Sequence, residues 1–158
     1  MQNLKIILLV EDNPNDVELA LEAFADYRLA NDIVVVNDGE AALDYLYRRG
    51  RFAAREPVFP AVVLLDLKMP KVDGLTVLRS VKADPGLKCI PIVMLTSSRE
   101  ERDPIESYQL GVNAYVVKPV DFGQFVEAVK KLGYFWAVLN EPPPLSGQVP
   151  EPRGVIPE

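Results

Sequence analysis

The sequence predicts an α/β fold in which a parallel β-sheet carries helices on both faces. Five short apolar runs alternate with segments whose apolar residues recur at helical spacing. Strict alternation of this kind is typical of parallel sheets, because each crossover helix packs back onto a face of the sheet. The runs are apolar at nearly every position, as expected for strands that are covered on both sides. With 158 residues, the chain is long enough for one domain with a sizeable core.

The predicted strands are the five apolar runs. They are Lys5–Val10, Ile33–Val36, Val62–Leu65, Ile92–Leu95 and Ala114–Val117. Each is short enough for a strand and is followed by polar or turn-forming residues.

A predicted helix follows each strand, marked by apolar residues that recur on one face. The marking residues are Val17, Ala20, Leu21 and Phe24; Ala42, Leu43, Leu46 and Tyr47; Leu75, Leu78 and Val81; Ile105, Tyr108 and Val112; and Phe122, Phe125, Val126 and Val129. Pro104 is tolerable in the first turn of the fourth helix.

Two segments fall outside this alternation. Residues 48–60 form a long basic connection before the third strand, either a loop or a helix extension. The last helix is expected to extend over 122–139, and its end is apolar on nearly every side, so it must be buried in its own domain or against a partner. Residues 1–140 therefore form the predicted domain, and 141–158, with six of the 14 prolines, form a Pro-rich tail.

Composition narrows the class of protein. A net charge of −6 and a pI near 4.8 argue against a nucleic-acid-binding surface. The chain has no histidine, so it cannot itself be a histidine phosphodonor. Cys89 is the single cysteine, and no apolar run approaches the ~20 residues of a membrane span. The N-terminus lacks the features of a signal peptide, and together these points favour a cytoplasmic protein.

Polar residues directly follow four of the predicted strands. Glu11 and Asp12 follow the first, Asp66 the third, Thr96 the fourth and Lys118 the fifth. The carboxyl ends of parallel strands meet at one edge of a sheet, which is where ligands bind in open α/β folds. The sequence thus predicts three acids, a hydroxyl and a cation at one edge.

This set of side chains suits a metal and a phosphoryl group. An all-oxygen site without His or Cys favours a hard ion such as Mg²⁺, because clustered carboxylates need a cation. Asp12 and Asp66 are the expected direct ligands, Glu11 binds directly or through water, and the backbone carbonyl of Lys68 is a candidate neutral ligand.

A metal-bound aspartate is also a nucleophile that can form an aspartyl phosphate. Lys118 would neutralise the phosphoryl oxygens and Thr96 would donate a hydrogen bond to one of them. Taken singly, each residue also has an ordinary structural interpretation: an N-cap turn for residues 11–15, a surface lysine, or a helix cap. Four such residues at the same ends of four strands favour the functional interpretation.

At these positions the chain closely resembles the receiver domain of two-component response regulators. The matching stretches are LLVEDNPND, VVLLDLKMPKVDG, IVMLTSS and AYVVKP, and the resemblance covers about residues 4–132. It implies a doubly wound sheet in the order 2-1-3-4-5, as in other flavodoxin-like folds.

The resemblance also implies a role for each residue. Asp66 would be the phospho-acceptor, and Glu11, Asp12 and the Lys68 carbonyl would complete the Mg²⁺ (or Mn²⁺) site. Thr96 and Tyr115 would be the switch residues. Lys118 would bind the phosphate, and Pro119 would follow a cis peptide bond. Phosphorylation would then repack the face built from the fourth helix, fifth strand and fifth helix.

The 48–60 connection and the ending LGYFWAVLNEPP are similar to the small regulators that partner bacterial phytochromes. This implies a phytochrome-type sensor histidine kinase as partner and a homodimer through the last-helix region. The candidate dimer residues are Leu132, Tyr134, Phe135, Trp136 and Leu139. The rival is burial of this stretch under the domain's own tail.

Two other classes of function remain open. A phosphatase or phosphotransferase of the haloacid-dehalogenase kind would carry a second acid two residues after the nucleophile, where this chain has Lys68. A phosphate-independent scaffold would not need the intact acid pair, Thr96 and Lys118. We therefore expect a signalling protein rather than an enzyme, with at most slow autodephosphorylation.

Overall fold

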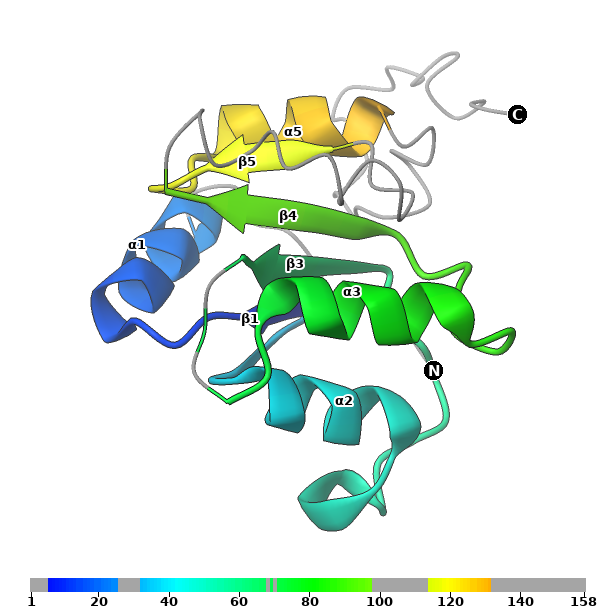
Figure 1. The fold of residues 1–158 in the computed structure, drawn as a ribbon. Coiled ribbons are helices and arrows are strands. Elements are labelled where there is room, and N and C mark those ends of the chain that lie inside the picture. Colours follow the sequence, from blue (N-terminus) through cyan, green and yellow to red (C-terminus); the bar gives the residue numbers. More distant parts are fainter. Residues whose placement is uncertain (1–5, 26–31, 68, 70, 98–113, 132–158) are drawn as a thin grey trace, which may run out of the picture.

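The computed structural model describes residues 6–25, 32–67, 69, 71–97 and 114–131. Within them, five parallel strands form one sheet in the order β2-β1-β3-β4-β5 (Figure 1). The strands are β1 (Ile6–Val10), β2 (Asp32–Val36), β3 (Val62–Asp66), β4 (Ile92–Thr96) and β5 (Tyr115–Val117). The predicted parallel α/β fold is confirmed, as is the strand order that the resemblance implied.

Helices follow four of the strands in the described part of the chain. They are α1 (Pro14–Ala25), α2 (Gly39–Tyr47), α3 (Gly74–Ala83) and α5 (Phe122–Lys131). The helix expected around residues 105–112 lies outside the described residues, as does the predicted continuation of the last helix beyond residue 131. The domain limits at 140 and 141 therefore stay predictions.

Alternate residues of the strands build two hydrophobic cores, one on each face of the sheet. In β1, Leu8 and Val10 pack with α2 and α3, whereas Ile7 and Leu9 pack with α1 and α5. Figure 1 shows α2 and α3 lying together on one face. On the other face Phe24 and Phe125 join α1 to α5, with ring centroids 4.9 Å apart. The strands are thus covered on both sides, which explains why they are apolar throughout.

The 48–60 connection is a loop with a short 3-10 turn rather than an extension of α2. The helix ends at Tyr47 because Arg48 takes a left-handed conformation (φ 57°), and the 3-10 turn spans Gly50–Phe52. Arg55 then anchors the loop: its Nε donates to the Tyr45 carbonyl at 2.8 Å, and its guanidinium carbon lies 4.1 Å from the centre of the Tyr45 ring.

Candidate functional site

The carboxyl ends of β1, β3 and β5 bring an acid pair and a lysine into contact. The Lys118 ammonium lies 3.1 Å from Asp66 Oδ1 and 3.3 Å from Glu11 Oε1. Both carboxylates are buried, with Glu11 exposed by 1% and Asp66 by 3%. Removing Lys118 would be costly, because it would leave two buried carboxylates without a compensating charge.

The oxygens of this edge fit a divalent cation. One oxygen from each of Glu11, Asp12 and Asp66 lies within 4.8 Å of the others. Two ligands of Mg²⁺, each about 2.1 Å from the ion, lie at most about 4.2 Å apart, so a small closure would suffice. Asp12 is exposed, which leaves one side open to water or a phosphate. Lys68, the expected source of a carbonyl ligand, lies outside the described residues.

Backbone contacts hold Glu11 in place at the end of β1. Its N–H donates to the Val36 carbonyl at 3.0 Å, and the Asn37 side chain donates to its carbonyl at 3.3 Å. The Asn13 N–H donates to Glu11 Oε2 at 3.2 Å. Asn13 also caps α1 by accepting from the N–H groups of the second and third residues after it. The N-cap interpretation therefore holds for this segment, and the functional interpretation of Glu11 and Asp12 stays a prediction.

Asp66 is fixed by close backbone packing. The Leu67 N–H donates to the Leu95 carbonyl at 3.0 Å, which continues the pairing of β3 with β4. Gly74, the first residue of α3, lies so close that a Cβ there would approach the Asp66 carbonyl oxygen to 2.2 Å. Asp73 caps the same helix by accepting from the Thr76 N–H at 2.9 Å. The start of α3 therefore locks the backbone of Asp66.

The predicted switch residues, Thr96 and Tyr115, lie on β4 and β5. Thr96 is buried at the end of β4, next along the sheet from Asp66. Its carbonyl accepts from the Lys118 N–H at 2.7 Å, which ties Lys118 to β4. Tyr115 is partly buried at the start of β5. The peptide bond between Lys118 and Pro119 is cis, the isomer that the resemblance implied.

The electrostatics of the site reflect burial. Burial, together with the charge of Asp66, raises the pKa of Glu11 to about 7, against a partial offset from Lys118. Burial also raises the pKa of Asp66, which the charge of Lys118 partly offsets. For Lys118, burial alone would lower the pKa, but hydrogen bonding to Asp16 and the charges of Asp66 and Glu11 raise it overall. A metal-free site thus holds protons more readily than exposed carboxylates would.

Asp16 is a site residue that the sequence analysis missed. It lies in the first turn of α1, and its Oδ2 is 3.1 Å from the Lys118 ammonium. An acid in the first turn of a helix is common for reasons of the helix dipole alone, so the sequence carries no distinguishing signal. The candidate dimer residues (Leu132, Tyr134, Phe135, Trp136 and Leu139) lie outside the described residues.

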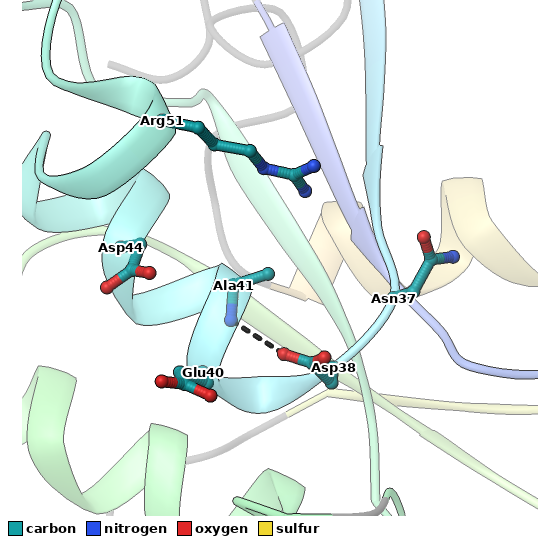
Figure 2. A pocket seen from close by; sticks show the side chains of 6 residues that line it. All are labelled: Asn37, Asp38, Glu40, Ala41, Asp44 and Arg51. Atoms are coloured by element: carbon teal, nitrogen blue, oxygen red, sulfur yellow. Dashed lines mark hydrogen bonds between the residues drawn. The ribbon is translucent and has the colours of Figure 1, made fainter.

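A separate polar cavity of about 310 Å³ lies at the start of α2 (Figure 2). Its lining residues are Asn37, Asp38, Glu40, Ala41, Asp44 and Arg51. Two of the acids in it already have partners. Asp38 accepts from the Ala41 N–H at 2.7 Å (Figure 2). Asp44 pairs with Arg49 at 2.8 Å. This cavity does not include the acid cluster.

The fold and the side chains that meet at the carboxyl edge of the sheet define a receiver domain. The chain belongs to the response regulator receiver domain family, whose model matches residues 7–130. Among solved structures it is similar to the bacteriophytochrome response regulator RtBRR, with 62% identity, 90% of this chain and 86% of that chain covered, and a TM-score of 0.81. A second bacteriophytochrome response regulator, AtBRR, is 60% identical, with 89% of this chain and 100% of that chain covered and a TM-score of 0.83.

The curated relatives include the response regulator Rcp1 of Synechocystis sp. It is 38% identical over 132 residues, which cover 84% of this chain and 88% of Rcp1. A solved structure of the Mn²⁺-bound form of Rcp1 matches 84% of this chain and 94% of that chain, with 38% identity and a TM-score of 0.67. In the described part of the chain, every helix is too short or too polar to cross a membrane.

Proposed function

We propose that this chain accepts a phosphoryl group on Asp66 from a sensor histidine kinase and acts as a phosphorylation-controlled signalling switch. The observation that carries the proposal is the Lys118 ammonium 3.1 Å from Asp66 Oδ1, inside a buried acid cluster at the carboxyl edge of the sheet. Phosphoryl transfer needs positioning and charge neutralisation more than covalent help, and this arrangement supplies both.

In the proposed transfer, an Asp66 carboxylate oxygen attacks the phosphorus of a phosphohistidine on the kinase. The P–N bond breaks, its electron pair returns to the imidazole, and the imidazole takes up a proton. Burial raises the pKa of Asp66, but Lys118 lowers it and so favours the ionised form. The lysine would then neutralise the phosphoryl oxygens, and the Thr96 hydroxyl would donate a hydrogen bond to one of them. Because this chain has no histidine, the phosphodonor must be another molecule.

Glu11, Asp12 and Asp66 are the residues proposed to hold Mg²⁺ or Mn²⁺, with the Lys68 carbonyl as a further ligand. When bound, the ion would neutralise charge on the transferring group. The relative Rcp1 has been solved with Mn²⁺ bound, which supports a divalent cation as the occupant of this site.

The signal would leave through the side of the sheet that carries β5. The phosphoryl group would make contacts with Thr96 and Tyr115 that exist in only one of two states. It would thereby bias the packing of the face expected from the predicted fourth helix together with β5 and α5. Asp66 is then an acceptor rather than a catalyst, and the protein would show at most slow autodephosphorylation.

The central test is incubation of the protein with acetyl phosphate in the presence and absence of Mg²⁺, followed by intact mass measurement. We expect a gain of about 80 Da, one phosphoryl group, that requires Mg²⁺ and disappears in Asp66→Asn. Asp44→Asn is the matched control, because Asp44 is an acid paired with Arg49 outside the cluster. A persistent gain in Asp66→Asn refutes the acceptor assignment, and sustained hydrolysis of a phosphoester would favour an enzyme instead.

The proposed donor is a phytochrome-type kinase, because two similar structures are bacteriophytochrome response regulators. Since such a kinase draws on ATP, the proposed compartment is the cytoplasm. A purified, autophosphorylated bacteriophytochrome kinase should transfer labelled phosphate to this chain much faster than an unrelated histidine kinase does. Equal rates would contradict the partner assignment while leaving the acceptor role intact.

We also propose a homodimer through residues 132–139, on the strength of their sequence. A helix over this stretch would be apolar on nearly every side, and the candidate dimer residues are Leu132, Tyr134, Phe135, Trp136 and Leu139. Phe135→Asp or Trp136→Asp should convert the dimer to a monomer in sedimentation experiments. An unchanged mass in solution would point to burial within one chain.

A further inference from the structure

Lys118 is shared among three carboxylates, and one of them has no part in the proposed metal cluster. The ammonium lies 3.1 Å from Asp66 Oδ1, 3.1 Å from Asp16 Oδ2 and 3.3 Å from Glu11 Oε1. Asp66 and Glu11 belong to the group of convergent oxygens together with Asp12. Asp16 comes instead from the first turn of α1.

We propose that Asp16 is a positioning residue that draws the charge of Lys118 away from Glu11 and Asp66, and thereby sets the affinity of the acid cluster for a divalent cation. This inference rests on the proposed function, because it assumes that the cluster binds Mg²⁺.

The local structure holds Asp16 where this role requires it. Its backbone N–H donates to Asn13 Oδ1 at 3.1 Å, and Pro14 starts the helix, so the turn that carries Asp16 is well determined. A carboxylate in the first turn is favoured by the helix dipole. Its side chain is 26% exposed, so water partly solvates its charge, whereas Glu11 and Asp66 are buried.

Asp16 competes with Glu11 and Asp66 for Lys118, because an ammonium has a limited number of hydrogen-bond donors. Lys118 has three N–H bonds and three carboxylate partners at hydrogen-bond distance. If Asp16 is removed, the ammonium has only Glu11 and Asp66 left, and it will bind them more closely. Because those oxygens are also the proposed ligands, the lysine then competes with the metal ion for them.

Asp16 also attracts a cation directly through its own charge, and the two effects must be separated. The direct attraction does not need the lysine, whereas the positioning effect acts only through it. A double-mutant cycle with Lys118→Ala therefore distinguishes them.

The experiment is titration calorimetry of Mg²⁺ into the unphosphorylated full chain at low salt. Asp16→Asn should weaken Mg²⁺ binding about five-fold, the scale of a partly exposed ion pair, and Asp16→Glu should recover most of the loss. In the Lys118→Ala background the same Asp16→Asn change should alter the affinity by less than about two-fold. Glu18→Gln is the matched control, because it removes the same charge from an exposed position on the same helix and should leave the affinity within about two-fold.

Unchanged Mg²⁺ affinity in Asp16→Asn would overturn the inference, as would an equal loss in the presence and absence of Lys118. Circular dichroism and urea unfolding of each variant establish that the fold is retained. If the wild-type protein binds no Mg²⁺ at all, the metal site of the proposed function fails and the inference fails with it. Binding by the wild type with no effect of Asp16→Asn overturns the inference alone.

Discussion

Replacing Glu11 with glutamine should stabilise the metal-free protein at alkaline pH, although it removes a residue of the proposed metal site. Glutamine has nearly the shape of the protonated glutamic acid and carries no charge. The buried carboxylate of Glu11 is close to that of Asp66, and the two share the single positive charge of Lys118. Removing one of the two negative charges removes the unfavourable free energy of burying that charge in the folded protein.

The magnitude follows from the raised pKa of Glu11. Burial is the main cause, and the pKa rises from 4.5 to about 7. The folded state therefore binds an extra proton between these two values, and its stability decreases as pH rises through this window. The resulting loss in the free energy of unfolding is absent below about pH 4.5 and complete above about pH 7, where it reaches about 3 kcal/mol at most.

Urea unfolding in EDTA, followed by circular dichroism, measures the effect. Glu11→Gln should raise the free energy of unfolding by about 1–3 kcal/mol near pH 8.5 and by much less near pH 5. Saturating Mg²⁺ should narrow the difference at the higher pH, because it stabilises the wild type more than the variant. A variant that is less stable than the wild type at pH 8.5 in EDTA would refute the reasoning.

Three further outcomes are expected. Gly74→Ala should lower the free energy of unfolding by about 2 kcal/mol or more in urea melts, because the new Cβ would lie 2.2 Å from the Asp66 carbonyl oxygen; wild-type stability would contradict the close packing. Arg55→Ala should lower the free energy of unfolding by about 1–2 kcal/mol and speed proteolysis of the 48–60 loop. Arg55→Lys should not restore stability, because lysine lacks the planar guanidinium that hydrogen-bonds to the Tyr45 carbonyl and stacks on its ring. Full restoration by lysine would be the contrary result. Mg²⁺ affinity measured by calorimetry should fall by up to about ten-fold per pH unit below pH 7, because a proton on Glu11 competes with the ion; an affinity independent of pH between 5 and 7 would count against that competition.

The sheet and most of its site residues were predictable because both depend on local sequence. A strand covered on both faces must be apolar throughout, so the first polar residue after it marks the carboxyl edge. Glu11, Asp66 and Lys118 were found in this way, and their side chains do meet. Parallel strands place such residues together whatever the details of the loops.

The parts that sequence reasoning missed depend on contacts between distant segments. Nothing in the sequence distinguishes Asp16 from an ordinary acid at a helix start, and its ion pair with Lys118 forms only because α1 packs near the end of β5. The need for glycine at position 74 comes from its distance to the Asp66 carbonyl. The sequence of the 48–60 connection is compatible with a loop or a helix, because its course depends on the hydrogen bond from Arg55 back to the Tyr45 carbonyl.

The most direct test of the central claim is the position of the acyl phosphate. The protein is treated with acetyl phosphate and Mg²⁺, reduced with borohydride, which converts a phosphorylated aspartate to homoserine, and sequenced by tandem mass spectrometry. We predict homoserine at position 66 alone, and none when EDTA replaces Mg²⁺. Homoserine at another acidic position, or none at position 66 in a protein that has gained a phosphoryl group, would contradict the account.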